Sequence, residues 1–321
     1  MKKLLLVIPI IAISVTSYFF FSTPEPPSST QGFIIDSGYR ADYASNPFVI
    51  SNDSDTLTLA YELRSERLKS SPSERVQIVT TTDGLDFTPV TSNLPQVVPA
   101  AILLPNGTYR RYHYDATQGG LVSESSTNGK MYANDPGVRY AVATDDQQAE
   151  NIFGVSTYFL DADGGVVLLY NVTDENDDVV VNRAYADPET NGLTFELEKT
   201  DVLDGTIEDE HYADPHSIVL SNGNVWLIVM NQTKGAKPPL GRQGVIYGYE
   251  STDGGKTFGG ARRLFGWDDV DEFDVYSLND PKIVEFPEGN IRIYVAAMIP
   301  DTSVNAPEKY KWIVISALAE L

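Results

Sequence analysis

Two Asp-Pro dipeptides, Asp214-Pro215 and Asp280-Pro281, stand at matching places in the chain, each after an acidic stretch and before an apolar run. Glu208 belongs to the first acidic stretch. A protonated carboxyl beside an ionised one can assist a leaving oxygen and activate water, which is what cleavage of a glycosidic bond needs. Asp214, Asp280 and Glu208 are therefore the candidate acid and base groups. Asp-Pro is also ordinary turn chemistry and acidic runs are usually solvated, so a structural role stays open.

Histidine and aromatic side chains lie within the same two acidic stretches. His211 and His216 stand among the carboxylates of the first stretch, and Trp267 and Tyr276 belong to the second. Aromatic rings of this kind can stack on sugars. The histidine and carboxylate spacing matches no established metal motif. We therefore predict no cofactor, with a structural cation such as calcium as the alternative.

The overall charge narrows the choice of partner. The 321 residues carry 23 Lys+Arg and 45 Asp+Glu, a formal net charge of −22, and no cysteine. An acidic excess of this size repels polyphosphate backbones, so nucleic acid is not expected as a partner. Because the chain has no cysteine, disulfide frameworks, thiolate metal sites and cysteine nucleophiles are excluded.

The first 31 residues have the composition of segments outside a folded domain. Lys2 and Lys3 precede an apolar run over 4–21, which is the pattern of an export signal. No clean small-residue cleavage site follows the run, so an uncleaved N-terminal membrane anchor is the alternative. Residues 23–31 are rich in Pro and Ser and predict an extended linker. We expect 1–22 to be a signal peptide or anchor and 32–321 to be a secreted, periplasmic or anchored domain outside the cytoplasm.

From residue 32 onward, short runs rich in Val, Ile, Tyr and Thr alternate with turn residues. Five similar units of apolar run, turn and apolar run start at positions 46, 98, 155, 214 and 280, and third strands are predicted at 76–82, 138–144, 179–186, 244–251 and 311–317. Periods of this size predict propeller blades. The predicted fold is an all-β propeller of five four-stranded blades, with six as the alternative, closed by residues 32–36 pairing with the last blade. Two β-sandwiches would fit the repeated hairpin less well.

A turn motif recurs between third and fourth strands. The fourth unit contains Ser251, Asp253, Gly255 and Phe258 in the sequence Ser-Thr-Asp-Gly-Gly-Lys-Thr-Phe, and Asp83 stands in a shorter copy in the first unit. Degenerate copies are suggested at 144–146 and 191–195. Such an aspartate can accept backbone N–H bonds inside a tight turn, so these residues are assigned to folding. The motif resembles the Asp box, or BNR repeat, and makes nearly all of 32–321 similar to sialidase-like or arabinanase-like β-propellers.

The resemblance implies a ligand face opposite these turns, and a sialidase would need arginines there to hold a substrate carboxylate. Arg40, Arg64 and Arg67 are the candidates for that role, and His211, His216, Trp267 and Tyr276 are further substrate-binding candidates. The sialidase Arg-Ile-Pro signature is missing, and its place is taken by the run Ala44-Ser45-Asn46-Pro47. The arabinanase-like family has a general-base aspartate where this chain has Asn46, so neither catalytic set transfers by alignment.

Two functions follow from these patterns. The first is an exported glycoside hydrolase of sialidase-like type that acts on terminal sugars of glycans. The alternative is a non-catalytic propeller that binds a glycan or a protein at the cell surface. Carboxylates that converge on the propeller axis would favour hydrolysis, and dispersed carboxylates would favour binding.

Overall fold

The computed structural model describes residues 32–53, 55–64, 76–90, 100–141, 155–173, 178–203, 210–233, 235–286, 289–303 and 309–319. All of these residues belong to one compact unit, Gln31–Leu321. The predicted signal segment and linker lie outside the described residues. Among the described residues, no helix has the length and apolar character needed to cross a membrane.

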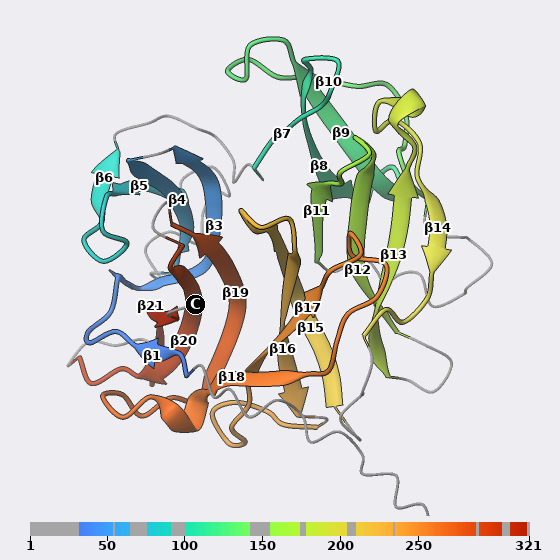
Figure 1. The fold of residues 1–321 in the computed structure, drawn as a ribbon. Helices are drawn as coiled ribbons and strands as arrows, with labels where there is room; N and C mark the ends of the chain where they lie inside the picture. Colours follow the sequence, from blue (N-terminus) through green and yellow to red (C-terminus); the bar gives the residue numbers. More distant parts are fainter. Residues whose placement is uncertain are drawn as a thin grey trace, which may run out of the picture. The chain divides into compact units, whose positions relative to one another are not determined.

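Five antiparallel sheets form a ring, which makes the fold a five-bladed β-propeller (Figure 1). Each blade has its first strand innermost, where it lies close to the first strands of neighbouring blades. Blade 1 contains β3 (Ala44–Asp53), β4 (Thr56–Leu63), β5 (Val76–Thr81) and β6 (Thr88–Val90). Blade 2 contains β7 (Ile102–Leu103), β8 (Tyr109–Asp115), β9 (Gly120–Ser126) and β10 (Ala133–Asn134). Blade 3 contains β11 (Ser156–Leu160), β12 (Val166–Thr173), β13 (Val179–Ala186) and β14 (Glu196–Lys199). Blade 4 contains β15 (Glu210–Val219), β16 (Val225–Thr233), β17 (Val245–Ser251) and β18 (Arg262–Gly266), and blade 5 contains β19 (Ser277–Glu285), β20 (Ile291–Pro300) and β21 (Tyr310–Ala319).

The predicted closure of the ring by the N-terminal strand is confirmed. Strand β1 (Ile34–Ile35) pairs antiparallel with β21 and supplies the outer strand of blade 5, and β2 (Ala41–Asp42) pairs farther along the same strand. Asp36 anchors this connection, because its carboxylate accepts hydrogen bonds from the buried Arg292 guanidinium and, at 2.6 Å, from the Ser316 hydroxyl. The N-terminal segment therefore covers the edge that β21 would otherwise leave unpaired.

The hydrophobic core lies between neighbouring blades. Side chains of β16 such as Ile228 and Met230 pack against blade 5, where Ile293 and Val295 of β20 join the same buried cluster. Val225, Leu227 and Val229 alternate with them and pack toward blade 3. Because β16 has a neighbouring blade on each face, its residues from Val225 to Met230 are all apolar and show no inside-outside alternation.

The turns between third and fourth strands are held by side-chain hydrogen bonds. The Asp253 carboxylate accepts backbone N–H bonds from Lys256 and Thr257, both at 3.0 Å, and the Ser251 hydroxyl accepts one from Gly255 at 2.8 Å. Asp83 does the same in blade 1, where backbone N–H bonds from Asp86 and Leu85 lower the pKa of its carboxyl to about 2. These contacts are those of a turn-forming motif.

Blade 2 differs from the prediction. The predicted third strand at 138–144 is wrong, because the third strand is β9, which follows β8 after a short turn closed by hydrogen bonds to Asp115. The blade's turn motif is likewise earlier than expected: Asn128 accepts backbone N–H bonds from Lys130 and Met131 at 2.9 and 3.1 Å. The suggested copy at 144–146 lies outside the described residues.

Removal of the Asp36 carboxylate should destabilise the fold. In Asp36→Ala the buried Arg292 guanidinium loses its anionic partner, which typically costs about 3–5 kcal/mol of unfolding free energy. Urea unfolding followed by far-UV circular dichroism measures the change. The matched control is Asp268→Ala, because Asp268 pairs with Arg263 where the two side chains are 51% and 40% exposed, and a loss below about 1 kcal/mol is expected. Equal losses in the two variants would contradict the closure role of Asp36.

Candidate active site

Three innermost strands share the same local distortion. Asn46, Asp214 and Asp280 all have positive φ angles, of 50°, 53° and 54°, and each precedes a proline. Each also lies where the pairing of its strand with the next one shifts register, in β3, β15 and β19. Proline cannot donate to the ladder, and Asn and Asp tolerate the left-handed region better than most residues. The resulting bulges break the regular pairing and re-aim the side chains.

Asp214 and Asp280 meet across the boundary of blades 4 and 5. The backbone N–H of Asp280 donates to Asp214 Oδ2 over 3.3 Å. The pKa of Asp280 is raised to about 6, first by burial and second by the negative charge of Asp214, while the Lys282 ammonium opposes both effects. Burial also raises the pKa of Asp214. The pair therefore retains a proton at pH values where exposed aspartates are fully ionised.

The residues that follow the two bulges complete this buried cluster. Lys282 is 5% exposed, and its ammonium lies 5.8 Å from the centre of the Phe48 ring. Burial lowers the pKa of Lys282, although the charges of Asp280 and Asp214 oppose the shift. His216 accepts a hydrogen bond at Nδ1 from the Ile283 N–H over 3.2 Å. Burial and the charge of Lys282 hold the pKa of His216 well below its usual value, so the ring is neutral with its proton on Nε2.

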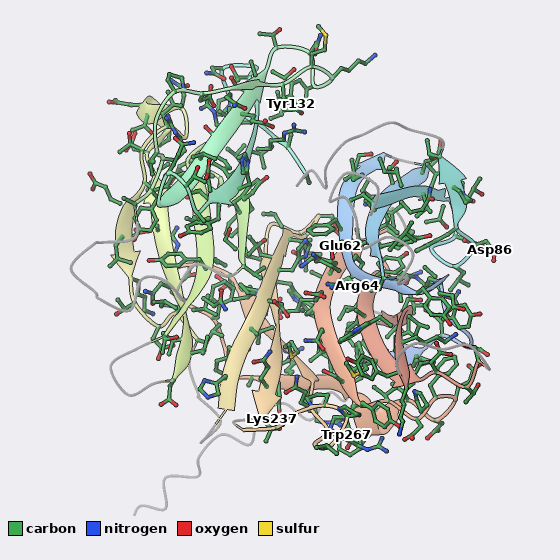
Figure 2. All side chains as sticks on the ribbon, turned by 180° about the vertical axis from the view of Figure 1, so that it is seen from behind. Glu62, Arg64, Asp86, Tyr132, Lys237 and Trp267 are labelled. Atoms are coloured by element: carbon green, nitrogen blue, oxygen red, sulfur yellow. The ribbon has the colours of Figure 1, made fainter. Side chains whose placement is uncertain are left out.

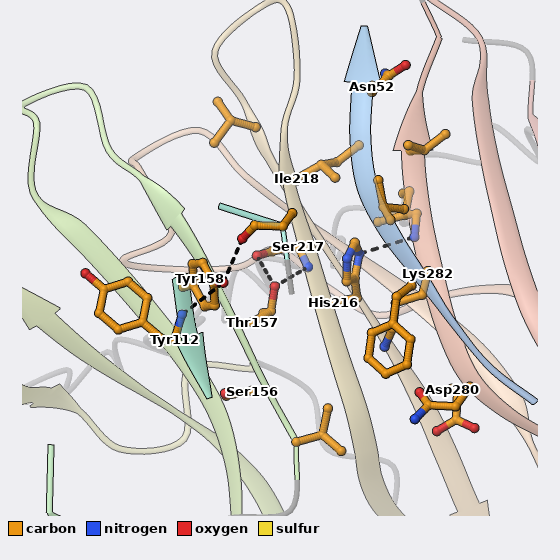
Figure 3. Close-up of a pocket in the computed structure, with 18 of the residues that line it drawn as sticks. Asn52, Tyr112, Ser156, Thr157, Tyr158, His216, Ser217, Ile218, Asp280 and Lys282 are labelled. Carbon is orange, nitrogen blue, oxygen red and sulfur yellow. Dashed lines mark hydrogen bonds between the residues drawn. The ribbon is translucent and has the colours of Figure 1, made fainter. Parts of the chain in front are cut away.

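A cavity of about 510 Å³ opens beside this cluster (Figure 3). Asn46, His216, Asp280 and Lys282 belong to one wall. The opposite wall comes from blades 2 and 3 and includes Tyr112, His113 and Tyr114 of β8 and Thr157 and Tyr158 of β11. Strand β8 reaches the cavity because the innermost strand of its blade, β7, has only two residues.

Hydrogen bonds fix the wall opposite the carboxylates. The Tyr158 hydroxyl donates to the Ala100 carbonyl at 2.7 Å and accepts the Tyr112 N–H at 3.2 Å. Thr157 and Ser217 join blades 3 and 4 through a hydroxyl contact of 3.0 Å. The cavity is therefore bordered by ordered strands from all five blades.

The sequence-predicted residues divide into three groups. Asp214 and Asp280 are in contact, and His216 lines the cavity with Asp280. Glu208 and Arg67 lie outside the described residues. The remaining candidates are placed away from the cavity lining: His211 accepts the Val179 N–H at 3.2 Å, and Trp267 and Tyr276 flank the Arg242 guanidinium at 5.2 and 5.6 Å.

The two described candidate arginines have protein partners. Arg40 donates to the backbone carbonyls of Leu85 and Ser37, at the turn after β5 and at the N-terminal connection. Arg64 forms an ion pair of 3.1 Å with Glu62 and donates to the Ser45 hydroxyl (Figure 2). Glu62 in turn accepts a hydrogen bond from the Asn46 amide at 3.4 Å. No arginine belongs to the described lining of the cavity.

Lys282 was not singled out from the sequence, although a signal was present. Side chains two positions apart in a strand share a face of the sheet. The residue two positions after the Asn or Asp of each bulge is therefore expected on the same face as that Asn or Asp. That rule applies to His216 after Asp214, to Lys282 after Asp280 and to Phe48 after Asn46, and all three line the cavity. Among the described residues, no group of three His, Asp or Glu side chains is arranged to hold a metal ion.

The fold is similar to those of solved glycoside hydrolases. The catalytic domain of a GH62 α-L-arabinofuranosidase from Coprinopsis cinerea matches with a TM-score of 0.57 and 11% identity, over 90% of this chain and 98% of that one. An α-L-arabinofuranosidase from Podospora anserina, in complex with cellotriose, matches with a TM-score of 0.55 and 12% identity, over 90% and 97%. A thermostable family-43 glycoside hydrolase gives 0.51 and 13%, over 88% and 91%. At these identities the likeness establishes the shared fold.

No protein-family model matches the chain, and no curated protein matches it. The three structures named above are arabinofuranosidases and a family-43 enzyme. They agree with the arabinanase-like half of the resemblance, and none of the three is a sialidase.

Asp280→Asn should make stability less dependent on pH. A carboxyl whose pKa is raised on folding to about 6 stabilises the fold fully only below its unfolded value near 4, and this contribution is lost as the pH rises through 6. The variant should therefore be more stable than wild type at pH 8, by on the order of 2 kcal/mol, and similar at pH 4. Asparagine at position 46 already adopts the same backbone conformation, so the replacement fits locally.

Urea unfolding at pH 4, 6 and 8 measures this effect. Asp86→Asn is the matched control, because Asp86 is exposed on the turn between β5 and β6, and the pH dependence of its stability should equal that of wild type. A wild-type-like pH dependence in Asp280→Asn would show that this carboxyl is not held in its protonated form.

Proposed function

We propose that the chain is a glycoside hydrolase whose reaction takes place at the Asp214–Asp280 pair. The observation that carries this proposal is that Asp280 lines the cavity while its backbone N–H donates to the Asp214 carboxylate over 3.3 Å, so that two partly buried aspartates lie side by side. The raised pKa of Asp280, about 6, supports a proton donor that still functions in mildly acidic solution. The shared fold with solved glycoside hydrolases agrees with this chemistry but does not carry it.

In the proposed reaction Asp280 is the general acid. It transfers its proton to the glycosidic oxygen as the bond to the anomeric carbon breaks, and the ionised Asp214 stabilises the positive charge that develops on the sugar. Water then adds to the anomeric carbon, and its proton returns to Asp280. The negative charge of ionised Asp214 opposes the loss of the Asp280 proton, so Asp280 is still protonated when the substrate binds.

Other residues of the cavity have binding roles in this proposal. The Phe48 ring and the partly exposed Tyr114 can contact the apolar faces of a sugar. Asn46 occupies the third bulge, where its amide is bound to Glu62. It offers a neutral hydrogen-bonding group at a place where an aspartate would add a third carboxylate beside Asp280.

Export and action on terminal sugars are part of the proposal. The charged and apolar pattern of residues 1–22 supports export or anchoring outside the cytoplasm. Because strands of all five blades line the cavity, we infer that it receives the end of a sugar chain. A sialidase activity has less support, because Arg40 and Arg64 already bind protein groups.

Hydrolysis of a panel of aryl glycosides tests the proposal. Wild type should release the aryl group from at least one member, and Asp280→Asn and Asp214→Asn should each lower kcat by about 10²- to 10⁴-fold. Asp86→Asn, which changes an exposed carboxylate at a turn, should retain wild-type activity. Circular dichroism spectra of all variants verify that they are folded.

Three results would speak against this function. Hydrolysis that survives both substitutions would place the reaction elsewhere. Equal loss in the Asp86 control would point to damage to the fold. A panel with no hydrolysed member, together with binding of a glycan to the folded protein, would favour the non-catalytic propeller.

A further inference from the structure

The axial cavity contains a buried cation whose role in hydrolysis is not explained by the carboxyl pair. Lys282 lines the cavity and is only 5% exposed. Its contact with the Phe48 ring is 5.8 Å long, and among the described residues no carboxylate lies within ion-pair distance of its ammonium. Asp280 and Asp214 act on it only through longer-range attraction.

A buried ammonium without a close anion is costly. Taking such a charge out of water costs several kcal/mol unless hydrogen bonds or an opposite charge compensate. The two nearby carboxyls compensate incompletely, because burial raises the pKa of both and the pair holds a proton in mildly acidic solution. An anion that enters the cavity beside Lys282 would supply the missing partner.

A second donor stands next to this ammonium. His216 occupies the position in β15 that Lys282 occupies in β19, two residues after the bulge, and both line the cavity (Figure 3). The Nδ1 atom of His216 accepts the Ile283 N–H, so Nε2–H is the donor that remains for a ligand. One charged and one neutral donor on adjacent strands suit the two oxygens of a carboxylate.

We propose that Lys282 and His216 form a carboxylate subsite, and that the glycan bound in the axial cavity carries a uronic acid. A single cation beside two aspartates favours a monoanion over a doubly charged phosphate, which Asp214 and Asp280 would repel. Cleavage of that glycan rests on the proposed hydrolase function, whereas binding of the uronate does not.

The subsite also predicts how binding depends on pH. Four charged groups act on Asp280: Asp214 from β15, Glu62 and Arg64 at the end of β4, and Lys282 from β19. The neutral His216 ring of β15 lines the same cavity. A docked carboxylate adds negative charge beside Asp280 and favours its protonated form. Uronate affinity should therefore fall as the pH rises from 5 to 7.5, since ionised Asp280 then repels the ligand.

Isothermal titration calorimetry of the full chain with free sugars tests the subsite without requiring catalysis. The ligands are D-glucuronate and D-galacturonate, each compared with its neutral amide, and none of these has a glycosidic bond to cleave. At pH 5.5 we expect at least one uronate to bind tenfold or more tightly than its amide. The same uronate should bind at least threefold more weakly at pH 7.5, and amide binding should not change.

Lys282→Met should abolish the preference for the uronate, and Lys237→Met, which removes an exposed lysine from the loop after β16, should retain it. If Lys282→Met fails to fold, His216→Gln provides the second variant, with a reduced preference expected. Equal binding of acid and amide by wild type, no uronate binding, or a preference retained in a folded Lys282→Met would each overturn the subsite. Hydrolysis of neutral glycosides without uronate binding would overturn the carboxylate subsite and leave the hydrolase function standing. Uronate binding without hydrolysis of any glycoside would overturn only the hydrolase function.

Discussion

The site depends on a backbone constraint at the start of the innermost strands. An Asn or Asp in the left-handed region, followed by proline, places a bulge in β3, β15 and β19. Proline removes one ladder hydrogen bond, and the bulge accommodates that loss while presenting the preceding side chain away from the regular pleat. The strain of a left-handed residue costs free energy that packing between blades must offset. Such strain, retained in three blades at once, agrees with a functional role for the side chains that it presents.

Because the bulges repeat at equivalent places in neighbouring blades, polar groups that are 66 positions apart in the sequence come into contact. The Asp280 N–H binds Asp214, and His216 binds the Ile283 N–H, so blades 4 and 5 are joined by two hydrogen bonds at the axis. The same proximity couples the charges. Burial and mutual repulsion favour the protonated form of the pair, and Lys282 limits that effect. The electrostatics of the site therefore follow from the packing of the blades.

The sequence predicted the architecture well because hairpins with apolar strands recur five times. The closing strand at 32–36 was predicted because no fourth strand follows the last repeat. It failed in blade 2, where the third strand contains Ser123, Glu124 and Ser125 and has little apolar signal. Ser123 and Ser125 both donate to Asp135, so side-chain hydrogen bonds support that strand where apolar burial is limited. At the site, equivalent Asp-Pro positions indicated Asp214 and Asp280. The burial of Lys282 and the protein partners of Arg40 depend on contacts between distant segments, which a single sequence does not reveal.

Asp280 can act as the proposed acid only if it keeps its proton to about pH 6 beside Asp214. A carbon-13 NMR titration of the aspartate side-chain carboxyls, with Asp280→Asn used to assign the resonance, measures this directly. One carboxyl should titrate near pH 6 in wild type, and this resonance should be absent from the variant. A midpoint near pH 4 for Asp280 would contradict it.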